Sequence, residues 1–333
     1  MENTDQQIPV VVTGATGFLG AVLCRKLVHA GYRVRAVYRR AEKLDQLANL
    51  DVETVQADVT DSDAIATAIE GAHIVFHIAA LFRQHGVPDS TFWSVNVNGT
   101  ENTLKASADA GVKRFIHCST VGVHSHIERP PADESEEYRP GDIYQSTKCE
   151  GEKLALDWFR EGRIDGCVIR PAMIWGPGDN RTLKLFRGIA RRRLPVIGDG
   201  QTELHWVLVD DVANGMILAA ESEKSSGQVY ILAGERPINI GELFQRIADC
   251  IGVEPIGYRV PAWPIQIAGE VIERLCRPFG IEPPLYRRRV DFFTKTRAFD
   301  WSKARNGLSY QPGQDLNSEI ERIVESYRSQ NLL

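Results

Sequence analysis

The feature that most constrains the fold is an alternation of short apolar runs with amphipathic stretches through the first two thirds of the 333-residue chain. The apolar runs predict buried strands at residues 8–13, 33–38, 52–58, 72–79, 114–120 and 166–174. Helical periodicity fills the intervals, for example at 19–31, at 41–50, near 91–110 and at 144–161. Continuous apolar strands separated by helices are typical of a parallel sheet covered on both faces. We therefore predict an α/β fold with a doubly wound parallel sheet.

A glycine-rich turn joins the first predicted strand to the first predicted helix. "VVTGATGFLG" at 11–20 places Gly14, Gly17 and Gly20 at this point. Glycine allows a tight turn and lets backbone N–H groups approach a pyrophosphate at the helix N-terminus. The spacing G-x-x-G-x-x-G differs from the usual G-x-G-x-x-G, and a purely structural turn is the alternative. In this strand–turn–helix context we predict a dinucleotide-binding Rossmann domain.

The expected cofactor contacts lie in this turn and after the following strands. Asp58, at the end of the third strand, is placed to bind the adenine, and the small Ala79 and Ala80 let the cofactor cross the strand ends. The full set of predicted cofactor-binding residues outside the catalytic motif is Gly14, Thr16, Gly17, Phe18, Leu19, Gly20, Arg39, Asp58, Val59, Ala79, Ala80 and Pro171.

The end of the second strand favours NADP over NAD. An acidic residue there would bind the ribose 2′-hydroxyl of NAD, whereas arginine suits the 2′-phosphate of NADP. The chain has Tyr38, Arg39 and Arg40 at this point, with Lys43 close behind, and no acid. Guanidinium groups match phosphate bidentately. A solvated loop at Arg39 and Arg40 is the alternative, in which case NAD stays open as the cofactor.

The alternation loosens after about residue 176, which indicates a second unit. We predict an NAD(P)-binding domain over 1–180, with 205–235 rejoining it through a helix and a strand. The remaining segments, 181–204 and 236–333, are predicted to form a smaller, interleaved α/β substrate-binding domain.

Composition limits the partners and the compartment. The net charge of −5 argues against nucleic acid as the main partner. The six cysteines are scattered without a C-x-x-C pair, which favours free thiols in a reducing cytosol over disulfides or a metal site. The polar start of the chain has no signal-peptide pattern, and no apolar run reaches the length of a membrane span. We therefore expect a cytoplasmic protein that acts on a small molecule.

"YQSTK" at 144–148 is a candidate catalytic motif. Tyr144 and Lys148 are separated by four residues on one predicted helix, so they share a face. A neighbouring ammonium lowers the pKa of a phenol, which would let Tyr144 exchange a proton with a carbinol or ketone. The fifth strand ends in Ser119 and Thr120, whose hydroxyls could hold the substrate oxygen. Two residues on a solvated helix face are the alternative.

Several motifs occur together in a fixed order. They are "TGATGFLG", "ADVTD" (57–61), "HIAA" (77–80), "NVNGT" (96–100), "CSTVGVH" (118–124), "YQSTK" and "RPAMIWGPGD" (170–179). In this the chain resembles an extended short-chain dehydrogenase/reductase. The resemblance implies that Tyr144 is the general acid/base, Lys148 its helper and a cofactor contact, and Thr120 the active-site hydroxyl, with Ser119 a weaker candidate. Asn96 resembles a family asparagine that we expect to hold backbone groups. Family members are often dimers.

At two positions the chain differs from the sugar-nucleotide enzymes of this family, which argues against a sugar-nucleotide substrate. Sugar-nucleotide epimerases and dehydratases usually carry an Asn after the sixth strand, where this chain has Pro171, and an Arg near "ELHWVLVDD" (203–211), which has none. "FDWSKARNGLSYQP" (299–312) is more similar to the hydroxysteroid dehydrogenase and dihydroflavonol reductase branch. We therefore expect an oxidoreductase that interconverts a secondary alcohol and a ketone on a sterol- or flavonoid-like substrate.

Two rival functions stay open. The first is a nucleotide-sugar epimerase or dehydratase with tightly bound NAD, for which the basic run Arg191–Arg193 could bind a diphosphate. The second is a non-enzymatic, cofactor-sensing protein of the same fold, which the presence of both Tyr144 and Lys148 disfavours.

The segment 259–293 is apolar, aromatic and basic at intervals. It could form a lid over an apolar substrate, make peripheral contact with a membrane surface, or pack as an ordinary amphipathic helix. His124 and Trp206 are further candidates for the substrate pocket, with packed structural roles as the alternative.

Overall fold

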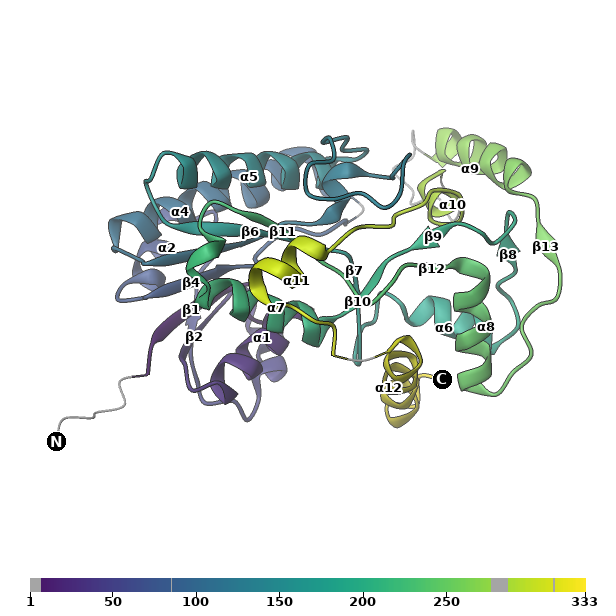
Figure 1. The fold of residues 1–333 in the computed structure, drawn as a ribbon, viewed down its shortest axis with the longest axis horizontal. Helices are drawn as coiled ribbons and strands as arrows, with labels where there is room; N and C mark the ends of the chain where they lie inside the picture. Colours follow the sequence, from purple (N-terminus) through teal and green to yellow (C-terminus); the bar gives the residue numbers. More distant parts are fainter. Residues whose placement is uncertain (1–6, 85, 277–286, 314) are drawn as a thin grey trace.

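The core of the protein is a seven-stranded parallel sheet (Figure 1). In this computed structural model, which describes residues 7–84, 86–276, 287–313 and 315–333, every strand of that sheet pairs in parallel with its neighbours. The strand order is β11 (Val229–Leu232), β6 (Gly166–Pro171), β5 (Arg114–Cys118), β4 (Ile74–His77), β1 (Pro9–Thr13), β2 (Arg33–Tyr38) and β3 (Val52–Gln56). The predicted doubly wound parallel sheet is confirmed.

Helices cover both faces of the sheet. On one face lie α1 (Phe18–His29) and α7 (Val209–Glu221), and on the other lie α2 (Ser62–Ile69), α4 (Gly99–Asp109) and α5 (Ile143–Arg160). Successive side chains of a strand point to opposite faces, so the central strand β1 contributes Val10 and Val12 to the first core and Val11 to the second. Each such fully buried aliphatic side chain stabilises the fold by roughly 1.5–3 kcal/mol.

The long helix expected near 91–110 is interrupted. It consists of α3 (Asp89–Trp93), a π-helical turn η2 (Ser94–Asn98) and α4. A π turn adds one residue to the helical repeat and re-aims the side chains within it. Asn96 lies in this turn and is buried, and its amide binds the backbone of Leu81. The helix expected at 41–50 is a 3₁₀ helix, η1 (Ala41–Leu47).

The sixth strand, predicted as one element over 166–174, is two strands. β6 ends at Pro171, and β7 (Met173–Trp175) leaves the main sheet to pair with β10 (Trp206–Leu208). The hydrogen-bond partners explain the break. The Ala172 N–H still binds the Leu232 carbonyl of β11, whereas the Met173 N–H binds the His205 carbonyl. The chain therefore passes from the main sheet to the second part of the molecule at this point.

The second part of the molecule lies beyond the carboxyl ends of the strands (Figure 1). It contains α6 (Leu183–Ala190), β8 (Val196–Ile197), β9 (Glu203–Leu204), β12 (Ile238–Asn239), α8 (Ile240–Ile251), β13 (Arg259–Val260), α9 (Ala262–Cys276), α10 (Arg287–Thr294) and α12 (Leu316–Ser329). Its own core includes Phe186, Leu243, Ile323 and Tyr327. Within 205–235, the stretch predicted to rejoin the main sheet, β11 pairs with β6, and α11 (Ser302–Leu308) packs on β11. The proposed domain boundaries remain a prediction.

Candidate active site

One cavity of about 1170 Å³ runs along the carboxyl edge of the main sheet to the second part of the molecule. Its lining includes every residue that the sequence predicts for catalysis or for cofactor binding. These are Gly14, Thr16, Gly17, Phe18, Leu19, Gly20, Arg39, Asp58, Val59, Ala79, Ala80, Ser119, Thr120, Tyr144, Lys148 and Pro171. The fold thus brings the glycine-rich turn and the "YQSTK" motif to a single site.

The glycine-rich turn has the geometry of an anion cradle. Gly14 has a φ of +71°, and a Cβ atom there would lie 2.9 Å from the backbone of Ala79. A Cβ atom at Gly20 would lie 2.2 Å from the Gly14 carbonyl oxygen. Helix α1 starts at Phe18 with neither a side-chain cap nor an acidic residue in its first turn. Its first N–H groups therefore have no side-chain acceptor at the cavity, and the pyrophosphate of a dinucleotide could bind them.

The end of β2 gives the cavity a positive rim. Arg39, Arg40 and Lys43 line it. The Arg39 guanidinium lies 3.9 Å from the Asp58 carboxylate, a loose contact at a side chain that is 45% exposed. Asp58 is held within its own loop by the Thr60 N–H and hydroxyl, at 3.0 and 2.8 Å. Arg39 is consequently available to a phosphate.

Tyr144, Thr120 and Lys148 meet in the middle of the cavity. The Tyr144 side chain is 9% exposed, and its hydroxyl makes no hydrogen bond within the described residues. The Thr120 hydroxyl accepts the Gly122 N–H at 3.0 Å, which leaves its own proton for another acceptor. The Lys148 ammonium donates to the Cys118 carbonyl at 2.7 Å. The phenol and the threonine hydroxyl are thus left to face a ligand.

The electrostatics of Tyr144 differ from the sequence-based expectation. Burial raises the pKa of Tyr144 to about 12, and the cation that chiefly opposes this rise is Arg83, not Lys148. Burial also lowers the pKa of Lys148. The Lys148 ammonium is directed at the Cys118 carbonyl, and it is not among the charges that chiefly shift the pKa of Tyr144, contrary to our expectation.

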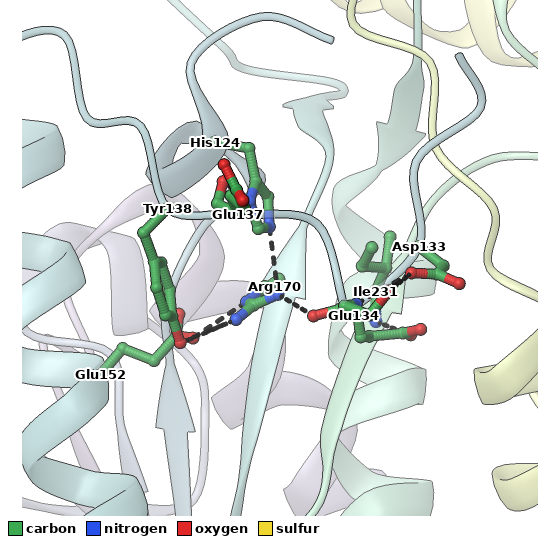
Figure 2. A network of polar contacts seen from close by, with 10 residues as sticks. His124, Asp133, Glu134, Glu137, Tyr138, Glu152, Arg170 and Ile231 are labelled. Carbon is green, nitrogen blue, oxygen red and sulfur yellow. Dashed lines mark hydrogen bonds and ion pairs between the residues drawn. The ribbon is translucent and has the colours of Figure 1, made fainter. Parts of the chain in front are cut away.

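A buried polar network lies next to the site, to which Ser119 joins it (Figure 2). Arg170 of β6 donates to Glu152 of α5 through Nε at 3.0 Å and also through Nη2. The remaining Arg170 donors bind His124 Nε2, the Glu134 carbonyl and the Tyr138 hydroxyl, at 2.9–3.0 Å. Each of the three nitrogens of this guanidinium therefore donates to an acceptor.

The same network engages two residues that the sequence proposed for the pocket. The Ser119 hydroxyl donates to Glu152, so Ser119 is less available to a substrate than Thr120. His124 is bonded to Arg170 on one ring nitrogen and to the Glu137 carbonyl on the other, and it does not line the cavity. Trp206 does line the cavity, and its ring stacks on Trp175 at 4.7 Å.

The loop that contains Glu134 also reaches the edge of the main sheet. The Glu134 carboxylate accepts the Ile231 N–H of β11 at 2.8 Å (Figure 2). Further along the loop, Ala132 forms a bridge with Phe299. The loop therefore ties the network to the outermost strand.

Asn96 holds backbone groups, as predicted. Its side chain accepts from the Leu81 N–H at 2.7 Å and donates to the Leu81 carbonyl and the Thr147 hydroxyl. Leu81 follows β4 at the cavity, so Asn96 fixes the chain beside Ala79 and Ala80. The basic run Arg191–Arg193 follows α6, which ends at Ala190, and does not line the cavity.

The part of the cavity that lies beyond Tyr144, toward the second part of the molecule, is called the substrate half. Sequence reasoning missed several residues that line it. They are Phe82, Arg83, Asp179, Arg181 and Arg297. For Phe82 and Arg83 a signal existed, because they follow β4 at the carboxyl edge, where such sheets bind ligands. A signal also existed for Glu152, because it follows Lys148 by four residues and so lies on the same helix face as Tyr144 and Lys148. Arg297 had none, because only the fold brings it to the site.

The segment 259–293 contributes two aromatic residues to the cavity. Phe292 and Phe293 of α10 line it, and their rings meet edge to face at 5.0 Å. On α9 the side chains of Trp263, Ile267 and Val271 are exposed and share one face. Residues 277–286 of the segment lie outside the described residues. Among the helices that are described, none has the length and apolarity to cross a membrane.

Comparison with known proteins identifies the family. Residues 10–241 match the NAD dependent epimerase/dehydratase family. Over 98% of its length the chain is 31% identical to a 3beta-hydroxysteroid-dehydrogenase/decarboxylase of Arabidopsis thaliana, of which it covers 81%. It is 28% identical, over 95% of its length, to a 2-alkyl-3-oxoalkanoate reductase of Stenotrophomonas maltophilia, of which it covers 98%.

Solved structures agree with this assignment. The crystal structure of gox2253 is 31% identical and superposes with a TM-score of 0.83, covering 97% of this chain and 99% of that one. A UDP-glucuronic acid 4-epimerase from Bacillus cereus in complex with NAD has a TM-score of 0.78 at 21% identity, with 97% and 99% coverage, and shows likeness of fold. The chain therefore belongs to the NAD-dependent epimerase/dehydratase family and is an NAD(P)-dependent enzyme of the extended short-chain dehydrogenase/reductase type.

Proposed function

We propose that the protein interconverts a secondary alcohol and a ketone on an apolar substrate. The observation that carries this proposal is the Tyr144 phenol, which is largely buried, has no hydrogen-bond partner among the described residues and borders the same cavity as the uncapped α1 N-terminus. A bound nicotinamide cofactor supplies or accepts the hydride in this chemistry.

The residues of the chain supply the proton and the orientation. The Thr120 hydroxyl donates a hydrogen bond to the substrate oxygen and so holds that oxygen beside Tyr144. Tyr144 gives a proton to the oxygen in reduction and takes it back in oxidation. Lys148 is held by the Cys118 carbonyl at the base of the site, from where it would contact the ribose beside the nicotinamide. The Glu152–Arg170 pair keeps Ser119, and with it the adjoining Thr120, in place.

The apolar substrate is supported by the lining beyond Tyr144. Phe82, Trp206, Phe292 and Phe293 border that half of the cavity, which suits a flat hydrophobic body such as a sterol or flavonoid. The names of the two relatives, a hydroxysteroid dehydrogenase/decarboxylase and an oxoalkanoate reductase, point to carbinol and ketone chemistry. A nucleotide-sugar epimerase or dehydratase is the rival, and NAD(H) that stays bound through purification would favour it.

We further propose NADP as the preferred cofactor, held at its 2′-phosphate by Arg39, with Arg40 and Lys43 beside it. Ala79, Ala80, Val59 and Pro171 would border the cofactor across the strand ends. A homodimer, a cytoplasmic location and peripheral membrane contact through the exposed face of α9 remain proposals of the same kind.

Replacement of the phenol tests the function. Tyr144→Phe should lower the turnover of 3β-hydroxysteroids with NADP by about 10²- to 10⁴-fold, because a general acid/base contributes that much. NADPH binding, measured by fluorescence titration, should be nearly unchanged. Tyr258→Phe is the matched control, because that side chain is 63% exposed and outside the cavity lining. Unchanged turnover in Tyr144→Phe would remove the phenol from the mechanism.

A further inference from the structure

Arg181 lies in the loop between β7 and α6 and reaches back to the glycine-rich turn. Its guanidinium carbon lies 5.0 Å from the centre of the ring of Phe18, the first residue of α1. The same carbon lies 5.8 Å from the centre of the Phe82 ring, which borders the substrate half. A guanidinium at these distances is attracted to an aromatic face. Arg181 therefore connects the cofactor side of the cavity with the substrate side.

The loop that carries Arg181, residues 176–182, is fixed between α1 and α12. At its start, a Cβ atom built on Gly176 would lie 3.5 Å from Cζ of Phe18. Further along, the hydroxyl of the fully buried Tyr327 of α12 donates to the Asp179 carbonyl at 2.5 Å and lies 3.0 Å from the Thr182 hydroxyl. The backbone of the loop therefore holds Arg181 in place without a ligand.

Asp179 fixes the direction of the guanidinium. Its side chain is 1% exposed, and its carboxylate accepts Arg181 Nε at 2.8 Å and Nη2 at 3.1 Å. Nη2 also donates to the Ile174 carbonyl at 3.0 Å. Nη1 has no acceptor within the described residues. The guanidinium is therefore anchored along one edge, and its remaining nitrogen is free to bind a ligand in the cavity that Arg181 lines.

The pyrophosphate of a dinucleotide needs more positive charge than the glycine-rich turn supplies. It carries a negative charge on each phosphate, whereas a helix N-terminus offers roughly half a positive charge. The first turn of α1, residues 18–21, contains no basic side chain. Arg181 lies beside that turn and keeps a donor free, so it can supply a charge-assisted hydrogen bond to a phosphate oxygen.

We propose that Arg181 binds the pyrophosphate of the cofactor through Nη1, so that the loop 176–182 covers the bound cofactor. The inference rests on the proposed placement of the pyrophosphate at the glycine-rich turn, and it does not depend on the substrate. Arg39 is proposed for the 2′-phosphate, which only NADP has, whereas both cofactors have the pyrophosphate. Arg181 should therefore contribute equally to the binding of NAD and of NADP.

A footprinting measurement on the unaltered protein tests the contact without turnover. Phenylglyoxal modifies accessible arginines, and the Arg181 side chain is 44% exposed. NAD at about ten times its dissociation constant should slow the modification of Arg181, followed by peptide mass spectrometry, about 10-fold. Arg160, which is 73% exposed and outside the cavity lining, is the internal control and should be modified at the same rate with and without NAD.

Titration of three nucleotides into a variant separates the pyrophosphate from the 2′-phosphate. NADP and NAD carry the pyrophosphate, and 2′-AMP carries the 2′-phosphate without it. In Arg181→Gln, NADP and NAD should each bind about 10- to 100-fold more weakly, as expected for a lost charge-assisted hydrogen bond. The affinity for 2′-AMP should stay within about 2-fold of the wild-type value. Arg191→Gln is the matched control, because Arg191 is exposed and outside the cavity lining.

Several outcomes would overturn the pyrophosphate contact. One is equal modification of Arg181 with and without NAD, which decides the matter even if Arg181→Gln does not fold. Another is unchanged NAD binding in Arg181→Gln, or a loss confined to NADP, which would assign Arg181 to the 2′-phosphate. Equal losses for all three nucleotides would also overturn it, because the variant would then have lost the whole site. The proposed oxidoreductase function fails separately, if Tyr144→Phe keeps full turnover, because nucleotide binding does not depend on the phenol.

Discussion

Arg170 lies in the buried network next to the site and Arg297 lines the cavity, and the surroundings of these two arginines differ sharply. Arg170 is 2% exposed and meets a carboxylate, an imidazole, a phenol and a carbonyl (Figure 2). Arg297 donates to two backbone carbonyls and forms no ion pair within the described residues. A buried charge with every donor satisfied serves the fold, whereas a charge with donors to spare at a cavity wall is available to a ligand.

The largest effect expected from this comparison comes from breaking the Glu152–Arg170 pair. Glu152→Leu should lower the free energy of unfolding by about 3–5 kcal/mol, because it leaves a buried guanidinium without its counter-charge. The double variant Glu152→Leu/Arg170→Met should lose much less than the sum of the two single variants. Urea unfolding measures all of them. Additive losses would mean that the pair is not a unit.

A smaller effect follows from His205, which joins the two parts of the molecule. The neutral ring donates to the Gly234 carbonyl at 3.0 Å and accepts the Phe299 N–H at 3.3 Å. Burial lowers the pKa of His205 to about 4. Because the folded pKa lies below the unfolded value of about 6.5, the unfolded chain binds the extra proton first, and stability is lost as pH falls from about 6.5 to about 4.

This loss should amount to about 3 kcal/mol for His205 alone, on the order of 1.4 kcal/mol per pKa unit. His205→Gln keeps a donor and an acceptor but cannot gain a proton. Its free energy of unfolding should therefore fall less steeply between pH 7 and pH 4.5 than that of the wild type, with exposed His29→Gln as the control. Parallel curves for His205→Gln and the wild type would contradict the assignment.

Arg39 extends the comparison to the other end of the cavity. It is loosely paired, at 3.9 Å from Asp58, so by the same reasoning it should serve a ligand. Arg39→Gln should weaken NADP binding about 10- to 100-fold, the usual value of charge-assisted hydrogen bonds, and leave NAD binding little changed. Calorimetric titration with both cofactors measures this. Arg33→Gln is the control, because Arg33 is exposed at the opposite end of β2.

The smallest effect is expected for an ion pair that looks strong by distance alone. Lys153 and Glu150 are 2.7 Å apart, but both side chains are more than 40% exposed. Glu150→Gln should change the free energy of unfolding by no more than about 0.5 kcal/mol, because water screens exposed pairs. A loss near that of Glu152→Leu would show that contact distance, and not burial with complete pairing, separates the two kinds of charge.

Local sequence information was sufficient for the main sheet and for the residues that line the cavity around the glycine-rich turn. The strand runs, the glycine spacing and the Tyr144–Lys148 pair are each encoded within a few residues, and their positions follow from the rule that ligands bind at the carboxyl ends of parallel strands. All residues predicted for the cofactor line the cavity.

The substrate half could not be predicted in the same way. Phe292 and Arg297 lie about 150 residues after Tyr144 in the chain and reach the cavity only through the packing of α10 and of the segment that follows it. The break between β6 and β7 does not follow from the local sequence either, because "CVIRPAMI" is apolar apart from Arg170 and the change of partner at Met173 depends on β10. The raised pKa of Tyr144 depends on burial, which a helical spacing does not report.

The bond between Glu134 and the Ile231 N–H also affects how the protein behaves in concentrated solution. β11 is the last strand on its side of the sheet, and the exposed N–H groups of such a strand are a template for another polypeptide. Here a carboxylate already occupies one of these groups, and the loop bearing it lies along the strand. The loop that completes the polar network thereby also guards the protein against edge-to-edge self-association.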